Sequence, residues 1–364
     1  MIPLCRHPCP PTLSDMQGEN NMPVTVHHFS ESWRAGWEAF TEAAPGATLA
    51  HADPWLFIIP QAMGHIDRSL IAERGGEVCG ILPMVLLSHW LFGTFHVSLP
   101  WLDYGGVLAH DAEAMQALID AATVQARQDR ARFIELRSVG PVFPELPIRE
   151  DKVTFWLPLG NADAVWKGLD AKVRNQVRKA QRAGLACQFG REELLPEFYH
   201  VFARNMRDLG TPVWGIALFE KILQAFPKTS EVVLIRLGDK GIGGGLVLTF
   251  KDTVYMPSAS SLREHFHLCP NNLLYWEVIK RACEAGYRQF DFGRSTIGSG
   301  TYHFKRQWGA AAQALQWQYV LLNGKKVPQL NPSNPRLRVF IEVWKRLPVG
   351  IANRLGPRIV HHLP

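Results

Sequence analysis

The chain has 364 residues, of which 47% are hydrophobic and 20% charged, a composition that describes a globular protein with ample material for a core and excludes a largely disordered one. Its 39 Lys and Arg residues exceed its 33 Asp and Glu residues, so the formal charge is +6 and the pI is about 9.0. This surplus favours anionic partners without naming one. The length predicts two domains.

The N-terminal run, residues 1–22, carries four prolines and no uninterrupted apolar core. We therefore expect a disordered tail and no signal peptide, with Met22 as an alternative initiator. No segment approaches the roughly 20 apolar residues of a membrane span. The cysteines form no CxxC pair and no zinc-ligand spacing, which predicts reduced thiols in a cytoplasmic protein. They are Cys5, Cys9, Cys79, Cys187, Cys269 and Cys283.

The first half of the chain mixes helices with hairpins. A helix is predicted over 30–43, a hairpin over 69–88 with its turn at two glycines, and a strand that enters a glycine turn over 98–109. An amphipathic helix over 111–130 and a strand over 131–139 follow. Because antiparallel hairpins precede a helix and a strand, this order predicts an α+β fold.

The second half repeats the order of hairpin, helix and strand. Two or three antiparallel strands are predicted over 230–260, a helix over 271–286 and a closing strand over 287–294. The glycines of 240–245 are not followed by GK[ST], so they predict a strand turn and no phosphate loop. In the closing strand Phe290 and Phe292 share one face, which places Asp291 on the other.

Two further segments carry a family resemblance. The run FDFGRSTIGSGTYHFKRQWGA, 290–310, resembles the closing motif of the FemAB family, and DAKVRNQVRKAQRAGL, 170–185, resembles the basic helix at the entry to that family's second domain. With 98–109 and 271–286 added, the resemblance covers most of 23–320. More narrowly, the chain is similar to the FemAB-related branch associated with PEP-CTERM and exosortase exopolysaccharide loci.

The resemblance implies tandem GNAT-like domains, each a mostly antiparallel twisted sheet flanked by helices. We expect one domain over 23–160 and a second over 161–330 with the basic helix 170–184 at its entry, followed by a basic amphipathic tail, 331–364. It also implies transfer of an acyl or aminoacyl group to an amine of a cell-envelope or exopolysaccharide precursor, which is lipid-linked in FemAB relatives. Those relatives use aminoacyl-tRNA as donor.

The closing motif supplies the candidate catalytic residues. Acyl transfer needs a fixed cation or donor for its oxyanion, and Lys305, between Phe304 and Trp308, is the first candidate. Asp291 could accept a proton from the attacking amine or could hold Arg294 or Arg306 in place. We favour the second role, because pairing makes a carboxylate a poor base. Arg294 is a candidate phosphate ligand.

The basic helix is a second candidate site. Arginines repeat every four residues at Arg174, Arg178 and Arg182, and like charges at that spacing repel unless an anion lies beside them. Together with Lys179 they predict either a phosphate-binding surface for tRNA or a polyprenyl-linked substrate, or a solvated helix face. An apolar stripe is predicted beside them at Leu169, Val173, Val177 and Ala180.

The donor is left open between aminoacyl-tRNA and acyl-CoA, and no tightly bound cofactor is expected. Where CoA-dependent GNAT enzymes carry a glycine loop, this chain has REHFHLCPNNLLYW, in which Pro270 removes one amide donor. His265 and His267 would share one side of a strand, but no third ligand has suitable spacing, so no metal site is expected. Asp103 and Tyr104, at a glycine turn, are candidates for the acceptor site or for a structural turn.

Two alternatives concern the partners. The tail over 335–364 either packs on the second domain through Val339, Phe340, Val343, Trp344 and Leu347, or rests on the anionic inner leaflet and makes the enzyme peripheral to the membrane. In place of an enzyme, the chain could also be a noncatalytic module that binds tRNA or polyprenyl phosphate.

Overall fold

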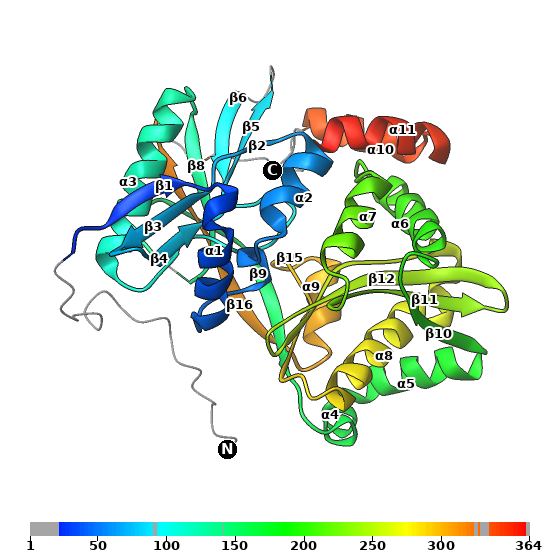
Figure 1. Cartoon of the computed structure of the whole chain (residues 1–364). Helices are drawn as coiled ribbons and strands as arrows, with labels where there is room; N and C mark the ends of the chain where they lie inside the picture. The colour runs from blue at the N-terminus through cyan, green and yellow to red at the C-terminus, as the bar shows by residue number, and fades with distance from the viewer. Residues whose placement is uncertain (1–21, 90–92, 141, 324–326, 328–334, 362–364) are drawn as a thin grey trace. The chain divides into compact units, whose positions relative to one another are not determined.

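The computed structural model describes residues 22–89, 93–140, 142–323, 327 and 335–361 (Figure 1). The chain forms two compact units, each considered by itself. Unit 1 comprises 1–60, 65–148 and 317–327, and unit 2 comprises 61–64, 149–316 and 328–364. Apart from Met22, the tail that we expected to be disordered lies outside the described residues.

Unit 1 is a set of short, mostly antiparallel strands covered by helices. One sheet has the order β1-β3-β4-β7, built from β1 (Thr25–His28), β3 (Leu70–Arg74), β4 (Glu77–Leu82) and β7 (Leu108–Ala109). Three further strands follow one another antiparallel, namely β2 (Ile66–Asp67), β5 (Val85–His89) and β6 (Gly93–Val97), and β6 pairs parallel with β8 (Phe133–Val139). The helical segments are η2 (Glu31–Trp33), α1 (Arg34–Ala43), η3 (Leu49–His51), α3 (Ala112–Gln128) and the start of α2 (Trp55–Met63).

Several predictions for this part of the chain are confirmed. The β3–β4 hairpin turns at Gly75 and Gly76, whose φ angles of 62° and 91° favour glycine, and α3 and β8 occupy the predicted segments. The strand predicted over 98–109 is wrong, because β6 ends at Val97 and only β7 is extended. Leu99 and Trp101 have positive φ in the loop between these strands.

Unit 2 contains a sheet with the order β10-β11-β12-β13-β14-β9, antiparallel except for the parallel pair β13–β14. Its strands are β9 (Ile148–Pro158), β10 (Leu185–Gly190), β11 (Ser230–Leu237), β12 (Lys240–Phe250), β13 (Thr253–Ser261) and β14 (Gln289–Asp291), and β15 (Ser295–Thr296) pairs with β9. Strand β16 (Ala311–Leu321) has residues in both units.

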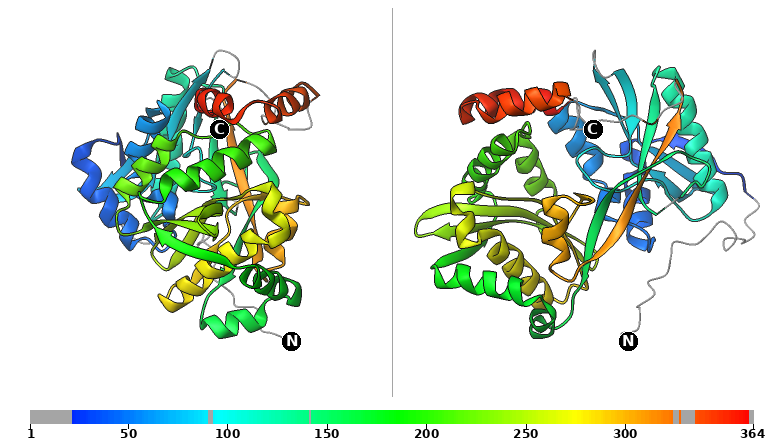
Figure 2. Two further views of the ribbon diagram at one scale, coloured as in Figure 1. Left: turned by 90° about the vertical axis from the view of Figure 1, so that its right-hand side faces the viewer. Right: turned by 180° about the vertical axis from the view of Figure 1, so that it is seen from behind.

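Helices cover both faces of this sheet. Helices α6 and α7 lie on one face and α5 and α8 on the other, as Figures 1 and 2 show. The helical segments of unit 2 are α4 (Ala162–Gly168), α5 (Ala171–Arg182), α6 (Leu195–Leu209), α7 (Ile216–Ala225), η4 (Arg263–Leu268), α8 (Pro270–Glu284), α9 (Gly300–Arg306), α10 (Pro335–Lys345) and α11 (Val349–Val360). The predicted stripe is buried, with Val173, Val177 and Ala180 on α5 and Leu169 at the end of α4.

Three local features of unit 2 bear on the sequence predictions. The glycines of 240–245 were predicted to form a turn, but they lie inside β12. Gly244 packs closely on β11, because an added Cβ would stand 2.5 Å from the carbonyl oxygen of Val233. His265 and His267 lie in the 3-10 helix η4 and not in a strand. The described cysteines, Cys79, Cys187, Cys269 and Cys283, are free thiols, and Cys5 and Cys9 lie outside the described residues.

The structure confirms the predicted fold class. Helices flank twisted, mostly antiparallel strands in both units, and in unit 2 the single parallel pair is joined by η4 and α8. This connection brings the end of β14, with the FDFG sequence, next to β13. No helix in the described part of the chain is long and apolar enough to cross a membrane.

Candidate functional site

The candidate site of unit 2 begins where the parallel strands β13 and β14 stop pairing. Their register covers three residue pairs and ends at Tyr255 opposite Asp291. Strand β13 then continues to Ser261, whereas the chain after β14 turns at Gly293, whose φ of 72° favours glycine. Beyond this point the backbone after β14 no longer pairs with β13 and bonds to other partners, such as Phe292 N–H to the Phe155 carbonyl oxygen at 3.0 Å.

Asp291 is held from three directions. It is 1% exposed and accepts hydrogen bonds from Thr154 Oγ1 at 2.6 Å, from Trp156 Nε1 at 3.0 Å and from the Gly293 backbone N–H at 2.7 Å. Thr154 and Trp156 belong to β9, which pairs antiparallel with β14. A carboxylate with this many donors is a fixed anchor. These donors are a threonine, a tryptophan and a backbone amide, so the favoured role of holding an arginine stays a prediction.

Lys305 is a buried cation at the same turn. Its side chain lies in α9, is 7% exposed, and donates hydrogen bonds from Nζ to the carbonyl oxygens of Gly293 at 2.7 Å and Arg294 at 2.8 Å. Helix α9 begins with Ser299 as a side-chain cap, which accepts from the backbone of Tyr302 at 3.2 Å. Lys305 is therefore not a solvated surface lysine.

Aromatic rings pack against one another next to this turn. Trp308 is 1% exposed, and its ring centroid lies 6.1 Å from that of Phe304 and 5.9 Å from that of Phe292. Tyr275 of α8 stacks on Phe292 with centroids 5.2 Å apart, and burial raises the pKa of this phenol. Because Lys305 is 7% exposed, solvent screens its charge less than that of a surface lysine.

The structure thus gathers one set of predicted residues around Gly293. Asp291 and Lys305 both bind its backbone, the half-buried Arg294 follows it, and Phe304 and Trp308 pack against the same cluster. Sequence reasoning missed Thr154 and Trp156, which lie more than a hundred residues from Asp291 in the chain. Only the alternating VTFWLP pattern around them indicated a strand.

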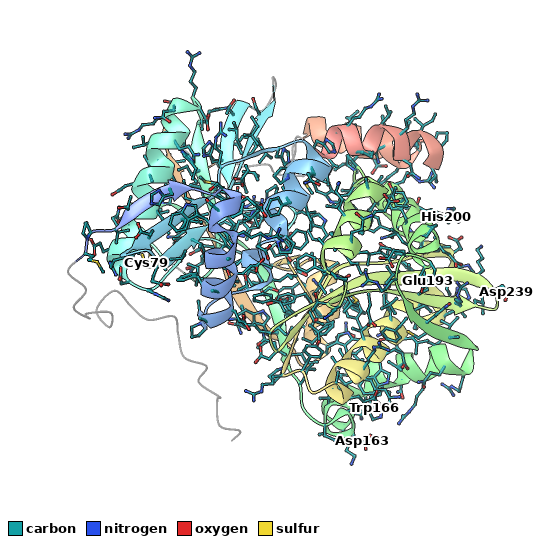
Figure 3. The ribbon with its side chains drawn as sticks, viewed as in Figure 1. Cys79, Asp163, Trp166, Glu193, His200 and Asp239 are labelled. Atoms are coloured by element: carbon teal, nitrogen blue, oxygen red, sulfur yellow. The ribbon has the colours of Figure 1, made fainter. Side chains whose placement is uncertain are left out.

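The basic helix α5 forms a second, separate group around α4. Arg174 donates from Nη1 to the Lys167 carbonyl oxygen at 2.9 Å and also to that of Leu169, so this cation binds the end of α4. Arg178 lies over the ring of Trp166, labelled in Figure 3, at 5.5 Å. Arg174 and Arg178 thus have partners within the chain, whereas Lys179 is exposed beside them; a phosphate-binding role of this helix stays a prediction.

The remaining candidates belong to unit 1. Asp103 is half-buried and its carbonyl oxygen accepts from Trp317 Nε1 at 3.2 Å, and Tyr104 is buried. Their loop surrounds Arg137, a side chain 1% exposed that donates to the Leu102 carbonyl oxygen at 2.9 Å and to Glu135 at 2.8 Å. Nothing in the sequence of this loop had indicated that buried ion pair.

No group of three or more His, Cys, Asp or Glu side chains that could hold a metal ion occurs in the described ranges. The start of α8 differs from a phosphate-binding helix start as the sequence predicts. Pro270 is the first residue of α8, and Cys269 before it has a φ of 60°. One amide donor is therefore missing where a pyrophosphate would bind.

Known proteins show the same architecture. Residues 169–306 match the family described as "Acetyltransferase (GNAT) domain", and this match ends directly after Lys305. No curated protein matches the chain. A crystal structure of FemX is 18% identical with a TM-score of 0.66, covering 82% of this chain and 98% of that chain.

Two further solved structures extend this likeness. The C-terminal domain of a putative lysylphosphatidylglycerol synthetase from Agrobacterium fabrum has a TM-score of 0.50 at 14% identity, covering 74% of this chain and 88% of that chain. A tandem GNAT protein from the clavulanic acid biosynthesis pathway has a TM-score of 0.50 at 12% identity, covering 84% of this chain and 100% of that chain. Residues 169–306 are therefore an acyltransferase domain of the GNAT fold, and the solved structures show the same fold over most of the chain.

Proposed function

We propose that the chain transfers an acyl or aminoacyl group to an amine of a cell-envelope or exopolysaccharide precursor. The observation that carries this proposal is the buried cation Lys305, fixed where β13 and β14 part. An acyl transferase needs such a fixed charge for the oxyanion of its tetrahedral intermediate. A surface lysine would be too mobile and too well screened to supply it.

The reaction follows from this placement. A neutral amine attacks the carbonyl carbon of the donor ester or thioester, a C–N bond forms, and negative charge develops on the carbonyl oxygen. Lys305 stabilises that charge. When the C–O or C–S bond of the donor breaks, the leaving group takes the electron pair and the amine's proton. Asp291 is a positioning residue in this scheme, because it holds the backbone of Gly293, which Lys305 also binds.

Aminoacyl-tRNA is the donor that we favour, and acyl-CoA is the alternative. The proline at the start of α8 weakens a pyrophosphate site, and Lys179, Arg178 and Arg294 offer positive charge for a phosphate backbone. GNAT acetyltransferase domains as a class use acyl-CoA as a substrate, which supports acyl-CoA as the alternative donor.

The acceptor and the place of action are also part of the proposal. The fold resembles that of FemX and of a putative lysylphosphatidylglycerol synthetase. The second name describes a lipid that carries a lysyl group, and this supports a lipid-linked acceptor. An enzyme with such an acceptor works at the cytoplasmic face of the membrane. Association with PEP-CTERM and exosortase loci is supported by the sequence resemblance alone. Asp103 and Tyr104 are proposed acceptor ligands.

The test is a transfer assay with a charged tRNA and an acyl-CoA as competing donors and an amine-bearing lipid precursor as acceptor. We expect product from the charged tRNA. Product from acyl-CoA alone would establish the alternative donor. Saturable, salt-sensitive binding of tRNA or polyprenyl phosphate with no product from either donor, and unchanged in a Lys305→Ala variant, would instead show a noncatalytic binding module.

A further inference from the structure

The last two helices of unit 2 have one face that packs against the domain. Trp344 of α10 is 3% exposed, and Ala352 of α11 is 1% exposed. Arg207 of α6 donates to the Leu347 carbonyl oxygen between the two helices at 2.8 Å. Figure 1 shows α10 and α11 beside α6. The packing predicted for this segment is therefore present, but it occupies only part of the helix surface.

The opposite face is apolar and exposed. In α10 Val339 and Val343 are 66% and 57% exposed, and in α11 Ile351 and Leu355 are 48% and 39% exposed. The sequence predicted one apolar face for Val339, Val343 and Trp344. In the structure the two valines lie on the exposed face and Trp344 lies on the packed face. Including Phe340, five of the eleven exposed large hydrophobic residues in the described part of the chain lie on these two short helices. Clustered exposure of this kind marks an interaction surface.

The same pattern of residues occurs on both helices. Val339 and Val343 are followed by Arg346 at positions i, i+4 and i+7, and Ile351 and Leu355 are followed by Arg358 at the same spacing. These positions share one helical face, so each outward stripe combines two aliphatic side chains with an exposed arginine. Among the described residues, no ion pair joins either arginine to a carboxylate.

The segment also carries most of the chain's net charge. Residues 335–364 contain six Lys and Arg residues and one Glu, a net charge of +5, whereas the whole chain has +6. The single acidic residue, Glu342, is bound to Lys345 at 2.7 Å. A partner for this face must therefore accept aliphatic side chains and carry negative charge beside them.

We infer that α10 and α11 lie on an anionic membrane surface, with Val339, Val343, Ile351 and Leu355 inserted at the boundary of the acyl chains and the arginines at lipid phosphates. This inference rests on the proposed function, since a lipid-linked acceptor lies at such a surface. A second copy of the chain fits less well, because a two-fold contact through this face would place arginines against arginines. Helices of 11 and 12 residues lie along a bilayer and do not span it.

The experiment is co-sedimentation of the full-length protein with two kinds of vesicle, phosphatidylcholine alone and phosphatidylcholine mixed equally with phosphatidylglycerol. We expect binding to the mixed vesicles that decreases with salt. Val343→Glu combined with Ile351→Glu should weaken it roughly tenfold or more, because charges replace the inserted side chains. The matched control is Val124→Glu, which alters a 54% exposed valine on α3 and should leave binding unchanged.

A second pair of variants tests the charge. Arg346→Gln with Arg358→Gln should weaken binding to the mixed vesicles by about fivefold per arginine, while Arg127→Gln on α3 should not. Absence of wild-type binding to the mixed vesicles would overturn the inference, as would an unchanged affinity of the Val343→Glu, Ile351→Glu variant. So would a concentration-dependent dimer that this variant abolishes.

The outcome is separable from that of the proposed function. Transfer to a short-chain, water-soluble acceptor should proceed normally in the Val343→Glu, Ile351→Glu variant, because these exposed side chains take no part in the contacts around Gly293. Normal vesicle binding without any transfer would contradict the proposed function and leave the membrane surface standing. Transfer without vesicle binding would support the proposed function and contradict the membrane surface.

Discussion

Asp291 and Lys305 hold the same residue from its two ends. The Asp291 carboxylate accepts from the Gly293 N–H at 2.7 Å, and the Lys305 ammonium donates to the Gly293 carbonyl oxygen at 2.7 Å. Both side chains are buried, so the turn after β14 is fixed by an anion on one side and a cation on the other. This arrangement accounts for the charged residues of the closing motif, and the predictions below depend on it.

Asp291→Asn should lower the free energy of unfolding by about 1–3 kcal/mol. The NH2 group of the asparagine would face at least one of the donors that the carboxylate now accepts from, and that hydrogen bond would be lost. Urea unfolding checks this value. The control is Asp239→Asn at the exposed β11–β12 turn, labelled in Figure 3, which should have no measurable effect.

The same variant separates positioning from proton transfer. A positioning role predicts a lower kcat with an unchanged shape of the pH–rate profile. If Asp291 is the general base, the acidic limb of that profile should disappear in the Asp291→Asn variant, and the positioning role would then be wrong.

Gly293→Ala should destabilise the protein by about 1–2 kcal/mol, because its φ of 72° is strained for a residue with a Cβ. Gly300, at the start of α9, has no neighbour within 4 Å of an added Cβ, so Gly300→Ala should be neutral or slightly stabilising. Thermal unfolding of the two variants tests the difference, and equal effects would refute the strained turn.

Arg174 and Lys179 lie on one helix but should respond differently to alanine substitution. Arg174→Ala should lower the melting temperature, because Arg174 binds two carbonyl oxygens at the end of α4. Lys179→Ala should leave stability unchanged, weaken tRNA binding and reduce its salt slope by about 1. A normal salt slope in the Lys179 variant would exclude this lysine as a phosphate ligand.

Asp53 predicts a pH dependence of stability. Burial, assisted by the charge of Glu38, raises the pKa of Asp53 from 3.8 to about 6 and outweighs its ion pair with Arg34 at 2.8 Å. Because the folded state holds this proton more tightly than the unfolded state, the group's contribution to stability is present at low pH and is lost as the pH rises from about 4 to about 6. Urea titrations of the wild type and Asp53→Asn should show this loss only in the wild type.

The sequence predicted the elements that depend on local pattern. The stripe of α5, the glycine turn of the β3–β4 hairpin and the paired faces of Phe290 and Phe292 follow from periodicity and from glycine's freedom at positive φ. The order of hairpins, helices and strands predicted the α+β class, and the FemAB resemblance added the tandem GNAT-like domains; the role of Lys305 stays a prediction.

Contacts between distant segments could not be predicted in the same way. Thr154 and Trp156 reach Asp291 only because β9 pairs with β14, and the loop at 98–107 bends around Arg137, a residue of β8. The glycines of β12 were assigned to a turn because the close approach of Gly244 to β11 is not visible in one sequence. Each of these contacts is set by tertiary pairing and not by local propensity.

The measurement that tests the central claim most directly is the single-turnover rate of acyl transfer in Lys305→Ala, compared with Lys280→Ala. Lys280 is a 46% exposed lysine on α8 and serves as the matched control. If Lys305 stabilises the oxyanion, its loss should slow transfer by about 10²–10³-fold while the Lys280 variant retains the wild-type rate. A wild-type rate in a folded Lys305→Ala protein would contradict the account.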